Sequence, residues 1–250
     1  MENHYRIGTD PEMFLFDKKG KFVAACGLFP GTKQEPYKVE GGAIQVDGLA
    51  LEFNINPADS CEEFTRYIAR VLEQIDDMLV PLGLTREFIP YVDIDPSYFA
   101  SLPDEAKILG CDPDFSGMTG LRKEPPEIGN LPFRTAAGHL HIGWGEHLDP
   151  DDPLHFEDCR YVAEHISVHT GNLWYLTAAC WQRLKYYGGE RAFRPKTYGV
   201  EVRSLDNLWV ANKQLQVRLY DRVIHEMRLI DKGVPEDVSE KKFKAIQKIA

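Results

Sequence analysis

Gly138-His139-Leu140-His141-Ile142-Gly143 is the stretch that best indicates how this chain folds. Its apolar residues Leu140 and Ile142 alternate with two histidines, which is the pattern of a β-strand that buries one face. Since side chains two residues apart leave a strand on the same side, both imidazoles would lie together on the other face. The flanking glycines permit close approach of a backbone or a ligand. At this point a purely structural role for the two histidines explains the pattern equally well.

Three further segments place two polar side chains two residues apart in a strand-like setting. They are Asp10-Pro11-Glu12, Glu52-Phe53-Asn54 and Glu201-Val202-Arg203. Taken alone, each has an ordinary explanation: a turn before a strand, a polar strand face, and a cross-strand ion pair. Four pairs that mix carboxylate, imidazole and guanidinium groups are harder to explain as a solvated face. If the four strands belong to one sheet, that face is predicted to bind metal and phosphate.

The remaining pattern predicts a single α+β domain over residues 1–233, an antiparallel sheet with helices on one side. Hairpins are expected at 11–27 and 43–55, the second turning at Asp47-Gly48, and strands at 88–94, 133–144 and 198–202. Helices are expected at 60–79, 155–170, 172–187 and 207–230.

Three local features complete this prediction. Ser60 and Glu63 form a capping-box pattern at the start of the first helix. The segment 95–131 is rich in Pro, Gly and Asp and is predicted to be a long loop that covers the substrate. Residues 234–250 are expected to form a peripheral tail.

Charge, hydropathy and cysteine pattern argue against several kinds of protein and partner. The net charge of −10 argues against nucleic acid as a bulk partner, because phosphate binding needs a basic face. The sequence contains no apolar run of about 18 residues, so no membrane span is expected. The first residues do not resemble a signal peptide, and the five cysteines form no metal or disulfide pattern. A cytoplasmic location is therefore predicted.

The residue types on the four strands point to a particular chemistry. Carboxylates that share a face repel each other by about 1 kcal/mol per pair at about 4 Å in water, so a fold that groups them normally supplies a cation. Asp, Glu and His ligands suit Mg²⁺ or Mn²⁺, with Zn²⁺ as an alternative. An arginine beside such ligands suits a site where a phosphoryl group is transferred. The pattern therefore favours ATP-dependent chemistry over simple hydrolysis.

A cluster of basic residues precedes the last of these segments: Arg183, Lys185, Arg191, Arg194 and Lys196. It predicts either a solvated charged loop or an anion clamp. Familiar nucleotide and protease signatures are absent, because the sequence contains no GxxxxGK[ST] motif and no GxGxxG motif before a helix. His225-Glu226 begins like the HExxH motif, but Leu229 stands where the second histidine would be.

Five motifs follow one another in the chain: Ile7-Gly8-Thr9-Asp10-Pro11-Glu12, Gly31-Thr32-Lys33, Leu51-Glu52-Phe53-Asn54, the stretch 134–143 around the histidine pair, and the stretch 192–204. Together they resemble the phage-type carboxylate–amine ligases (amidoligases, type 2) of the glutamine synthetase-like superfamily. The resemblance covers roughly residues 5 to 210. It implies a curved antiparallel sheet that carries metal ligands on its concave face.

The resemblance also implies an activity. ATP would phosphorylate a substrate carboxylate, and an amine would then displace phosphate to leave an amide. The implied cofactors are ATP and Mg²⁺ or Mn²⁺, and the implied substrates are small-molecule or peptide carboxylates and amines. If the protein is phage-encoded, it would act in the host cytoplasm.

Site residues follow from the same resemblance, by position. The implied metal ligands are Glu12, Glu52, His139 and Glu201, with Asp10 and His141 as secondary candidates. Arg203 is implied to steady the transferred phosphoryl group, so that Arg203 and Glu201 are the catalytic residues. The implied phosphate or carboxylate clamps are Lys33, Arg134, Arg194 and Lys196.

Two other classes of function stay open on the sequence alone. The first is a metal-dependent hydrolase that uses His139 and His141 as an HxH pair. It is disfavoured because an arginine, rather than a further ligand, accompanies Glu201. The second is a binding protein that keeps a ligase-like sheet without turnover.

Overall fold

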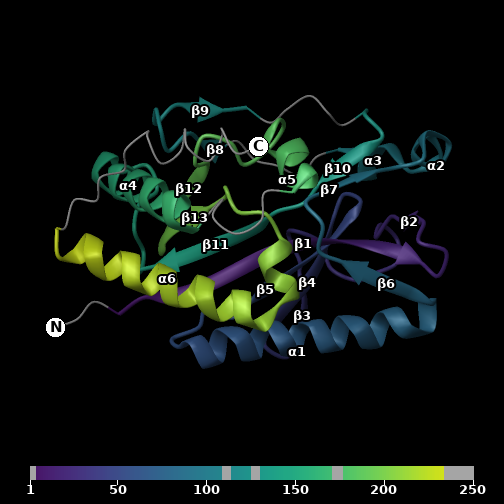
Figure 1. Ribbon diagram of the computed structural model, residues 1–250, viewed down its shortest axis with the longest axis horizontal. Coiled ribbons are helices and arrows are strands. Elements are labelled where there is room, and N and C mark those ends of the chain that lie inside the picture. The colour runs from purple at the N-terminus through teal and green to yellow at the C-terminus, as the bar shows by residue number, and fades with distance from the viewer. Residues whose placement is uncertain (1–3, 109–113, 125–129, 171–176, 234–250) are drawn as a thin grey trace.

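The computed structural model describes residues 4–108, 114–124, 130–170 and 177–233 (Figure 1). The strands are β1 (Arg6–Asp17), β2 (Phe22–Val23), β3 (Tyr37–Val39), β4 (Gly42–Asp47), β5 (Ala50–Ile55), β6 (Leu84–Glu87), β7 (Tyr91–Asp93), β8 (Asp114–Phe115), β9 (Arg122–Lys123), β10 (Phe133–Thr135), β11 (Gly138–Gly143), β12 (Phe193–Lys196) and β13 (Gly199–Val202). The helices are α1 (Cys61–Leu79), α2 (Pro96–Ser101), α3 (Asp104–Lys107), α4 (Pro153–Thr170), α5 (Ala178–Leu184) and α6 (Lys213–Asp231), with 3₁₀ turns η1 (Val80–Leu82) and η2 (Leu208–Ala211).

A large antiparallel sheet forms the centre of the molecule. Within the described ranges it has eleven strands, in the order β3-β4-β5-β1-β11-β13-β12-β8-β9, with β2 and β6 also pairing with β1. The long strand β1 pairs with β11 through its first half and with β6 and β2 through its second half. The mixed helices and antiparallel sheet confirm the predicted α+β class.

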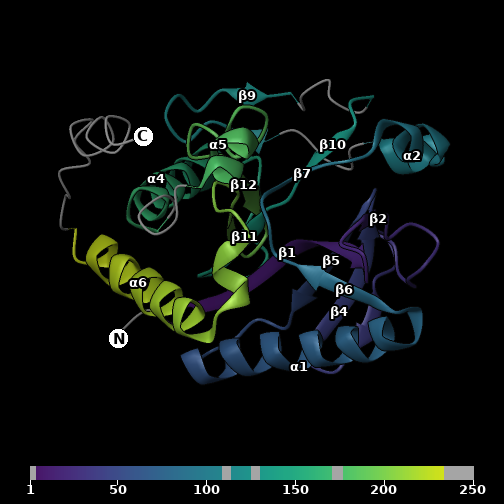
Figure 2. The same cartoon turned by 45° about the vertical axis from the view of Figure 1, so that its right-hand side comes forward.

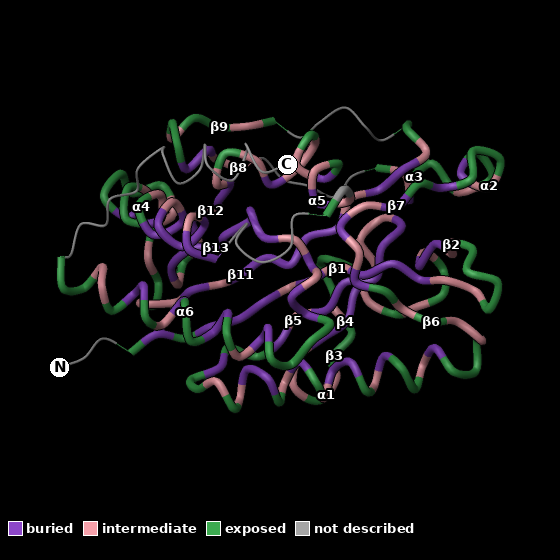
Figure 3. The backbone as a smooth tube through the Cα atoms, in the orientation of Figure 1, coloured by how far each residue is buried: buried purple, intermediate pink, exposed green. Residues whose placement is uncertain are grey.

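The two faces of the sheet differ because its strands alternate apolar and polar residues. Ile7 and Met13 of β1, with Leu140 of β11, belong to the main core, which also contains Ile68 of α1 and Ile166 of α4. Helices α1, α4 and α6 therefore cover one face (Figures 1 and 2). Buried residues run along the central strands, while α1 alternates between buried and exposed positions (Figure 3). The polar residues of the central strands lie on the opposite face.

A second, smaller apolar cluster lies on that opposite face, at the end of β1 near α2. It contains Phe14 of β1, Val92 of β7 and Phe99 of α2. Phe14 leaves β1 on the same side as Asp10 and Glu12, because all three positions are even-numbered along one strand. The polar residues are therefore bounded at one end by an apolar wall.

The helix that the capping box predicts is confirmed. The Ser60 hydroxyl accepts the Glu63 N–H at 3.2 Å, and α1 begins at Cys61. The Glu63 carboxylate in turn accepts the Asp59 N–H at 3.1 Å. After α1, Gly83 takes a left-handed conformation with φ of 67° and ends the following 3₁₀ turn.

Several predicted boundaries need correction. The hairpin of β4 and β5 turns at Gly48-Leu49, one residue later than expected, because Asp47 pairs with Ala50. Of the strand predicted at 88–94, only β7 is a strand; β6 ends before it, and Pro90, which cannot donate to a ladder, lies between the two. The loop predicted at 95–131 contains α2, α3, β8 and β9. The predicted tail, 234–250, lies outside the described residues.

Two predicted helices are shorter than expected. Of the span 172–187, the described part is helical over α5 only. The span 207–230 divides into η2 and α6, because the Asn212 side chain accepts the Gln214 N–H at 2.8 Å and starts a new helix there. None of the described helices combines the length and apolar composition that crossing a membrane requires.

Candidate functional site

The four polar pairs lie on four neighbouring strands, β5, β1, β11 and β13. Members of adjacent pairs face each other across the ladders: Glu12 and Glu52, Asp10 and His139, His141 and Glu201. The intervening residues point into the main core, as Leu140 and Val202 do. The prediction that the pairs share one face of one sheet is therefore confirmed.

These side chains line a cavity of about 690 Å³, within the size range of small-molecule sites. Further lining residues come from strands and loops beside the four pairs: Lys33, Gln45, Asp47, Trp144, Tyr187, Arg194, Lys196 and Tyr198. The cavity therefore combines carboxylates, imidazoles and cations, with aromatic groups along its sides.

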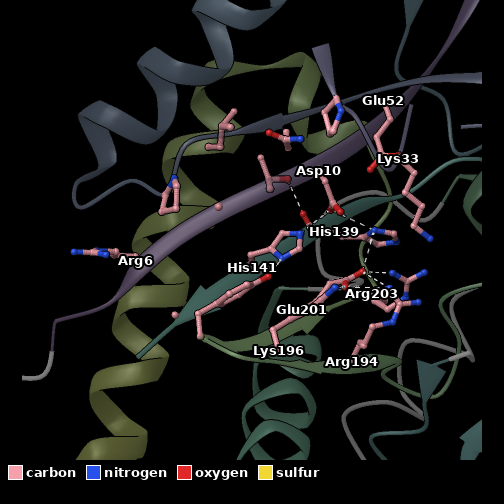
Figure 4. Close-up of a pocket in the computed structure, with 18 of the residues that line it drawn as sticks. Arg6, Asp10, Lys33, Glu52, His139, His141, Arg194, Lys196, Glu201 and Arg203 are labelled. Carbon is pink, nitrogen blue, oxygen red and sulfur yellow. Dashed lines mark hydrogen bonds and ion pairs between the residues drawn. The ribbon is translucent and has the colours of Figure 1, made fainter. Parts of the chain in front are cut away.

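Asp10, His139 and Glu201 form the centre of the cavity, and their side chains point toward one another (Figure 4). The Nδ1 atom of His139 lies 3.4 Å from Asp10 Oδ1 and 3.6 Å from Glu201 Oε1. One donor atom from each residue lies within 4.8 Å of the other two. A nitrogen and two carboxylate oxygens gathered around one point are a suitable donor set for a divalent cation. The residues therefore fit the metal that the sequence predicts.

The charges in this cluster also suit a cation. Burial raises the pKa of Asp10, but the imidazoles of His141 and His139 outweigh it and hold that pKa well below its usual range. Burial and Asp10 raise the pKa of Glu201, yet its cationic neighbours leave it lowered. Burial, reinforced by Arg203, lowers the pKa of His139 to about 4. At pH 7 the cluster therefore offers two carboxylates and a neutral imidazole, which is the metal-binding form of histidine.

Glu12 and Glu52 form a second acidic pair beside this cluster. Glu12 Oε2 accepts the Ala137 N–H at 2.7 Å, and Glu52 Oε2 accepts the Gln45 amide at 2.8 Å. Burial, with the charge of Asp47 adding to it, raises the pKa of Glu12 to about 8. Burial and the neighbouring carboxylates also raise the pKa of Glu52 well above its usual value. Two such groups ionise together only when a cation neutralises them, so this pair also fits a metal.

The raised pKa of Glu12 predicts a pH-dependent stability of the metal-free protein. The folded state holds a proton on Glu12 between the usual 4.5 and about 8. This contribution is fully present below pH about 4.5 and is lost as the pH rises through about 8. Glu12 alone should therefore lower the free energy of unfolding by at most about 1.4 kcal/mol per pH unit in that window.

Urea unfolding with EDTA, at intervals from pH 5 to pH 8.5, measures this slope. The Glu12→Gln variant should have a flatter profile, because its amide does not titrate. Equal slopes for the two proteins would contradict the prediction. Addition of Mg²⁺ should raise stability most at the high end of the range, because the cation competes with the proton.

Three cations converge on the Glu201 carboxylate, which is 1% exposed. Lys196 Nζ lies 2.7 Å from Oε2, Arg194 Nη1 lies 3.2 Å from the same oxygen, and Arg203 donates to Oε1. A single carboxylate needs only one positive charge for neutrality. Asp114 also pairs with Arg203, and three cations gathered at one place in the cavity are suited to bind an anion with several oxygens. Arg203, Arg194 and Lys196, which the resemblance implies as phosphate-binding residues, thus lie together beside Glu201 in the structure.

The Arg203 side chain is held in place by several neighbours. Its guanidinium carbon lies 5.3 Å from the centre of the Tyr187 ring, and its Nε lies 3.5 Å from Asp114 Oδ2. Beneath it, the fully buried Arg183 donates to the backbone carbonyls of Arg203 and Ser204 at 3.1 Å each. Arg183 is therefore a positioning residue rather than an anion clamp.

Two tyrosines in the site were not predicted from the sequence. Tyr198 contacts His141 Nδ1 through its hydroxyl, and the Tyr187 hydroxyl lies 3.4 Å from His139 Nε2. Each orients one imidazole, as groups around metal ligands commonly do. Tyr187 follows α5 and Tyr198 lies in the turn between β12 and β13, so neither belongs to the alternating pattern that marks the other site residues.

The structure corrects the prediction for Arg134. This residue does not line the cavity; its guanidinium donates to the carbonyls of Leu131, Phe133 and Lys107, at 3.0, 2.6 and 2.8 Å. It also stacks over Phe99, with 5.0 Å between the guanidinium carbon and the ring centre. The reason is that β10 pairs with β7 in a separate two-stranded sheet. Arg134 therefore stabilises a loop and does not lie where it could bind a phosphate in the cavity.

Other predicted residues divide between the cavity and its surroundings. Lys33 and Asn54 line the cavity. Of the basic cluster, Lys185 pairs with Gln182 at 3.0 Å, and Arg191 pairs with Glu164 on α4. None of the described residues in 95–131 lines the cavity. The role of that segment as a cover for the substrate stays a prediction.

Comparison with known proteins shows one distant structural similarity and no family for this chain. No protein-family model matches the chain, and no curated protein matches it. A solved structure described as a novel glutamine synthase homolog is similar to it, with 16% sequence identity and a TM-score of 0.49. The similarity covers 93% of this chain and 56% of that one, so the chain spans little more than half of that structure's length. Membership of the phage-type ligases stays a prediction, and the function must be inferred from the cavity.

Proposed function

We propose that this protein is an ATP- and divalent-metal-dependent ligase that joins a carboxylate to an amine through an acyl phosphate. The observation that supports this most is the environment of Glu201. Asp10 and His139 gather with its carboxylate around a point where a cation fits, and Arg194, Lys196 and Arg203 contact the same carboxylate. Metal ligands and several cations that share one carboxylate are the combination that phosphoryl transfer needs.

Each group of residues has a distinct task in this proposal. Asp10, His139 and Glu201 would hold one cation, and Glu12 and Glu52 would hold another. When bound, these cations would neutralise the charge of the β- and γ-phosphates. Arginine and lysine side chains of β12 and β13 would bind the oxygens of the γ-phosphoryl group as it moves to the substrate carboxylate.

The reaction balances in two steps. A substrate carboxylate oxygen would attack the γ-phosphorus, and the bond from that phosphorus to the β-phosphate oxygen would break to give ADP. The amine nitrogen would then attack the acyl carbon, and phosphate would leave. The proton that leaves the amine nitrogen in this step would pass to the departing phosphate, which balances the reaction.

A metal-dependent hydrolase is the alternative that shares most of these features. It would use the same cluster of Asp10, His139 and Glu201. It gives no task, however, to the three cations on Glu201, which a hydrolase of neutral bonds does not need. The ligase is therefore the better-supported function.

ATP and Mg²⁺ together should raise the melting temperature by about 5 to 10 °C at 100 times the dissociation constant. ATP alone or Mg²⁺ alone should give a much smaller rise, because each supplies a charge that the other neutralises. Lys196→Ala should reduce this joint shift. Lys185→Ala removes a charge from the same basic cluster but outside the cavity, and should leave the shift unchanged.

An ADP-release screen across pairs of carboxylates and amines tests turnover directly. A ligase should release ADP only when both substrates are present, and mass spectrometry should find the amide. Release of product from an ester or amide with Zn²⁺ or Mn²⁺ and no nucleotide would instead establish the hydrolase. Absence of ADP release from every pair, with no joint thermal shift and no metal-dependent hydrolysis, would contradict both enzymes and leave a binding protein.

A further inference from the structure

A second group of metal-competent side chains lies on the other side of the sheet, away from the cavity. His165 and His169 belong to α4, and Glu226 belongs to α6, which packs against α4. One donor atom from each of the three lies within 4.8 Å of the others. Exposed fractions of 1% for His165, 8% for His169 and 0% for Glu226 place the group in the interior.

The two histidines are arranged as helical metal ligands are. Because they are four residues apart, they project from the same face of α4, and their ring centres lie 5.1 Å apart. Glu226 faces them from the neighbouring helix: His165 Nε2 lies 2.9 Å from Oε2, and His169 Nδ1 lies 3.9 Å from Oε1. His225-Glu226 has the first two residues of an HExxH motif. The two histidines that face Glu226 lie on another helix, α4.

The Glu226 carboxylate is oriented in a way that suits one metal bond. Arg222, one turn earlier on α6, donates to Oε1 at 3.0 Å, and its side chain is 43% exposed. Oε2 is left facing His165. A carboxylate that binds a cation through one oxygen and a hydrogen-bond donor through the other is common around metals. Arg222 is therefore compatible with a cation on Oε2.

His165 also has a nitrogen that its neighbours do not satisfy. Its Nε2 lies within hydrogen-bond distance of Glu226, while its Nδ1 is buried and makes no hydrogen bond to any described residue. No tautomer of this ring satisfies both nitrogens with the described protein groups. A buried polar atom in this state costs about 1 to 3 kcal/mol, so the described protein groups do not hold His165 as a fully hydrogen-bonded structural histidine.

From this cluster we propose that His165, His169 and Glu226 form a second metal site, which takes a Zn²⁺-type transition-metal cation and joins α4 to α6. Two imidazoles and one carboxylate suit such a cation better than Mg²⁺. Tetrahedral Zn²⁺ with bonds of about 2.0 to 2.2 Å holds its donors roughly 3.3 Å apart. His165 Nε2 lies 2.9 Å from Glu226 Oε2, and one donor atom of each of the three residues lies within 4.8 Å of the others, so small side-chain movements would complete the site.

The position of the site gives it a structural consequence. Val162 and Ile166 of α4, Val223 of α6, and Val200 and Val202 of β13 belong to the same core. A cation between α4 and α6 would therefore fix the layer on which β13 rests, and β13 carries Glu201 on its other face, with Arg203 directly after it. The site is independent of the proposed ligase chemistry and would stand without it.

Zinc binding to the folded protein tests this proposal. The background is the Glu12→Gln, Glu201→Gln double variant, which removes one carboxylate from each of the two metal-competent groups in the cavity. In this background we expect one equivalent of Zn²⁺ that survives gel filtration and raises the melting temperature by about 5 to 10 °C at 100 times its dissociation constant. Adding His169→Gln should weaken Zn²⁺ binding by at least about 100-fold.

Matched variants and a spectroscopic measurement complete the test. His225→Gln removes an exposed histidine next to Glu226 and should leave the zinc equivalent intact. Co²⁺ in place of Zn²⁺ should give the strong visible absorption of a tetrahedral ion with nitrogen ligands. This measurement needs no variant in the cluster, so it decides the question if His169→Gln does not fold. Zn²⁺ affinity that His169→Gln leaves unchanged, or a Co²⁺ spectrum typical of six oxygen ligands, would overturn the site and leave a buried ion pair.

Discussion

Replacing Arg203 by alanine is expected to lower kcat by about a thousand-fold while the ATP concentration at half-saturation changes by less than about five-fold. Arg203 is 4% exposed, contacts Glu201 and stacks on Tyr187 inside the cavity. Arg194 and Lys196 remain in the variant to bind the phosphates of the ground state. Arg203 is the cation expected to bind the oxygens of the phosphoryl group as it is transferred. Its loss should therefore raise the free energy of the transition state more than that of bound ATP.

ADP release, measured with the carboxylate and amine pair found by screening, gives both kinetic constants. Arg134→Ala is the matched control, because Arg134 is an equally buried arginine whose partners lie outside the cavity. It should keep kcat even if it lowers the melting temperature. Arg203→Lys keeps the charge but loses the two-pronged geometry, and should fall between the parent and Arg203→Ala. A similar loss of kcat in the Arg134 and Arg203 variants would show that Arg203 acts only through stability.

The Glu201→Gln variant is expected to lose the joint thermal shift by ATP and Mg²⁺, with metal affinity lower by at least about 100-fold. Glu201 is the one residue that belongs both to the cluster with Asp10 and His139 and to the contacts with the three cations. Its neutral amide cannot replace the carboxylate in either. The variant also leaves the cations without their buried counter-charge, so metal-free phosphate should bind more tightly than to the parent.

Calorimetric titrations with Mg²⁺, ATP and inorganic phosphate separate these effects. The control is Glu164→Gln, which removes another carboxylate that is paired with an arginine, Arg191, but lies on α4 outside the cavity. Circular dichroism establishes that both variants are folded. An unchanged response of Glu201→Gln to ATP and Mg²⁺ would remove Glu201 from the metal site, and unchanged phosphate affinity would contradict the role given to the three cations.

Much of the site could be predicted from the sequence because its pattern is local. Alternation of polar and apolar residues fixes which side chains share a face of a strand, and His139 with His141 is the clearest case. The start of α1 is equally local, because Ser60 and Glu63 lie within one helical turn. Both predictions needed only residues that are close together in the sequence.

Other features depend on contacts between residues that are distant in the sequence. The order of strands places β1 between β5 and β11, which no short window of sequence determines. Arg134 belongs to the same sequence motif as His139, yet β10 pairs with β7 outside the main sheet and takes Arg134 away from the cavity. Tyr187 enters the site from the segment after α5. Single polar residues of this kind have no period by which to recognise them.

The alternation of ligand and core residues along the same strands restricts how the chain can change length. Leu140 lies between the two site histidines, and Val202 lies between Glu201 and Arg203. An insertion of one residue within β11 or β13 would turn every following side chain to the other face, so that the site and the core fail together. An insertion of two residues keeps each side chain on its face and shifts only its position along the strand. Natural variants of this sheet should therefore differ in length in their loops, where the rim of the cavity can change while its floor is kept.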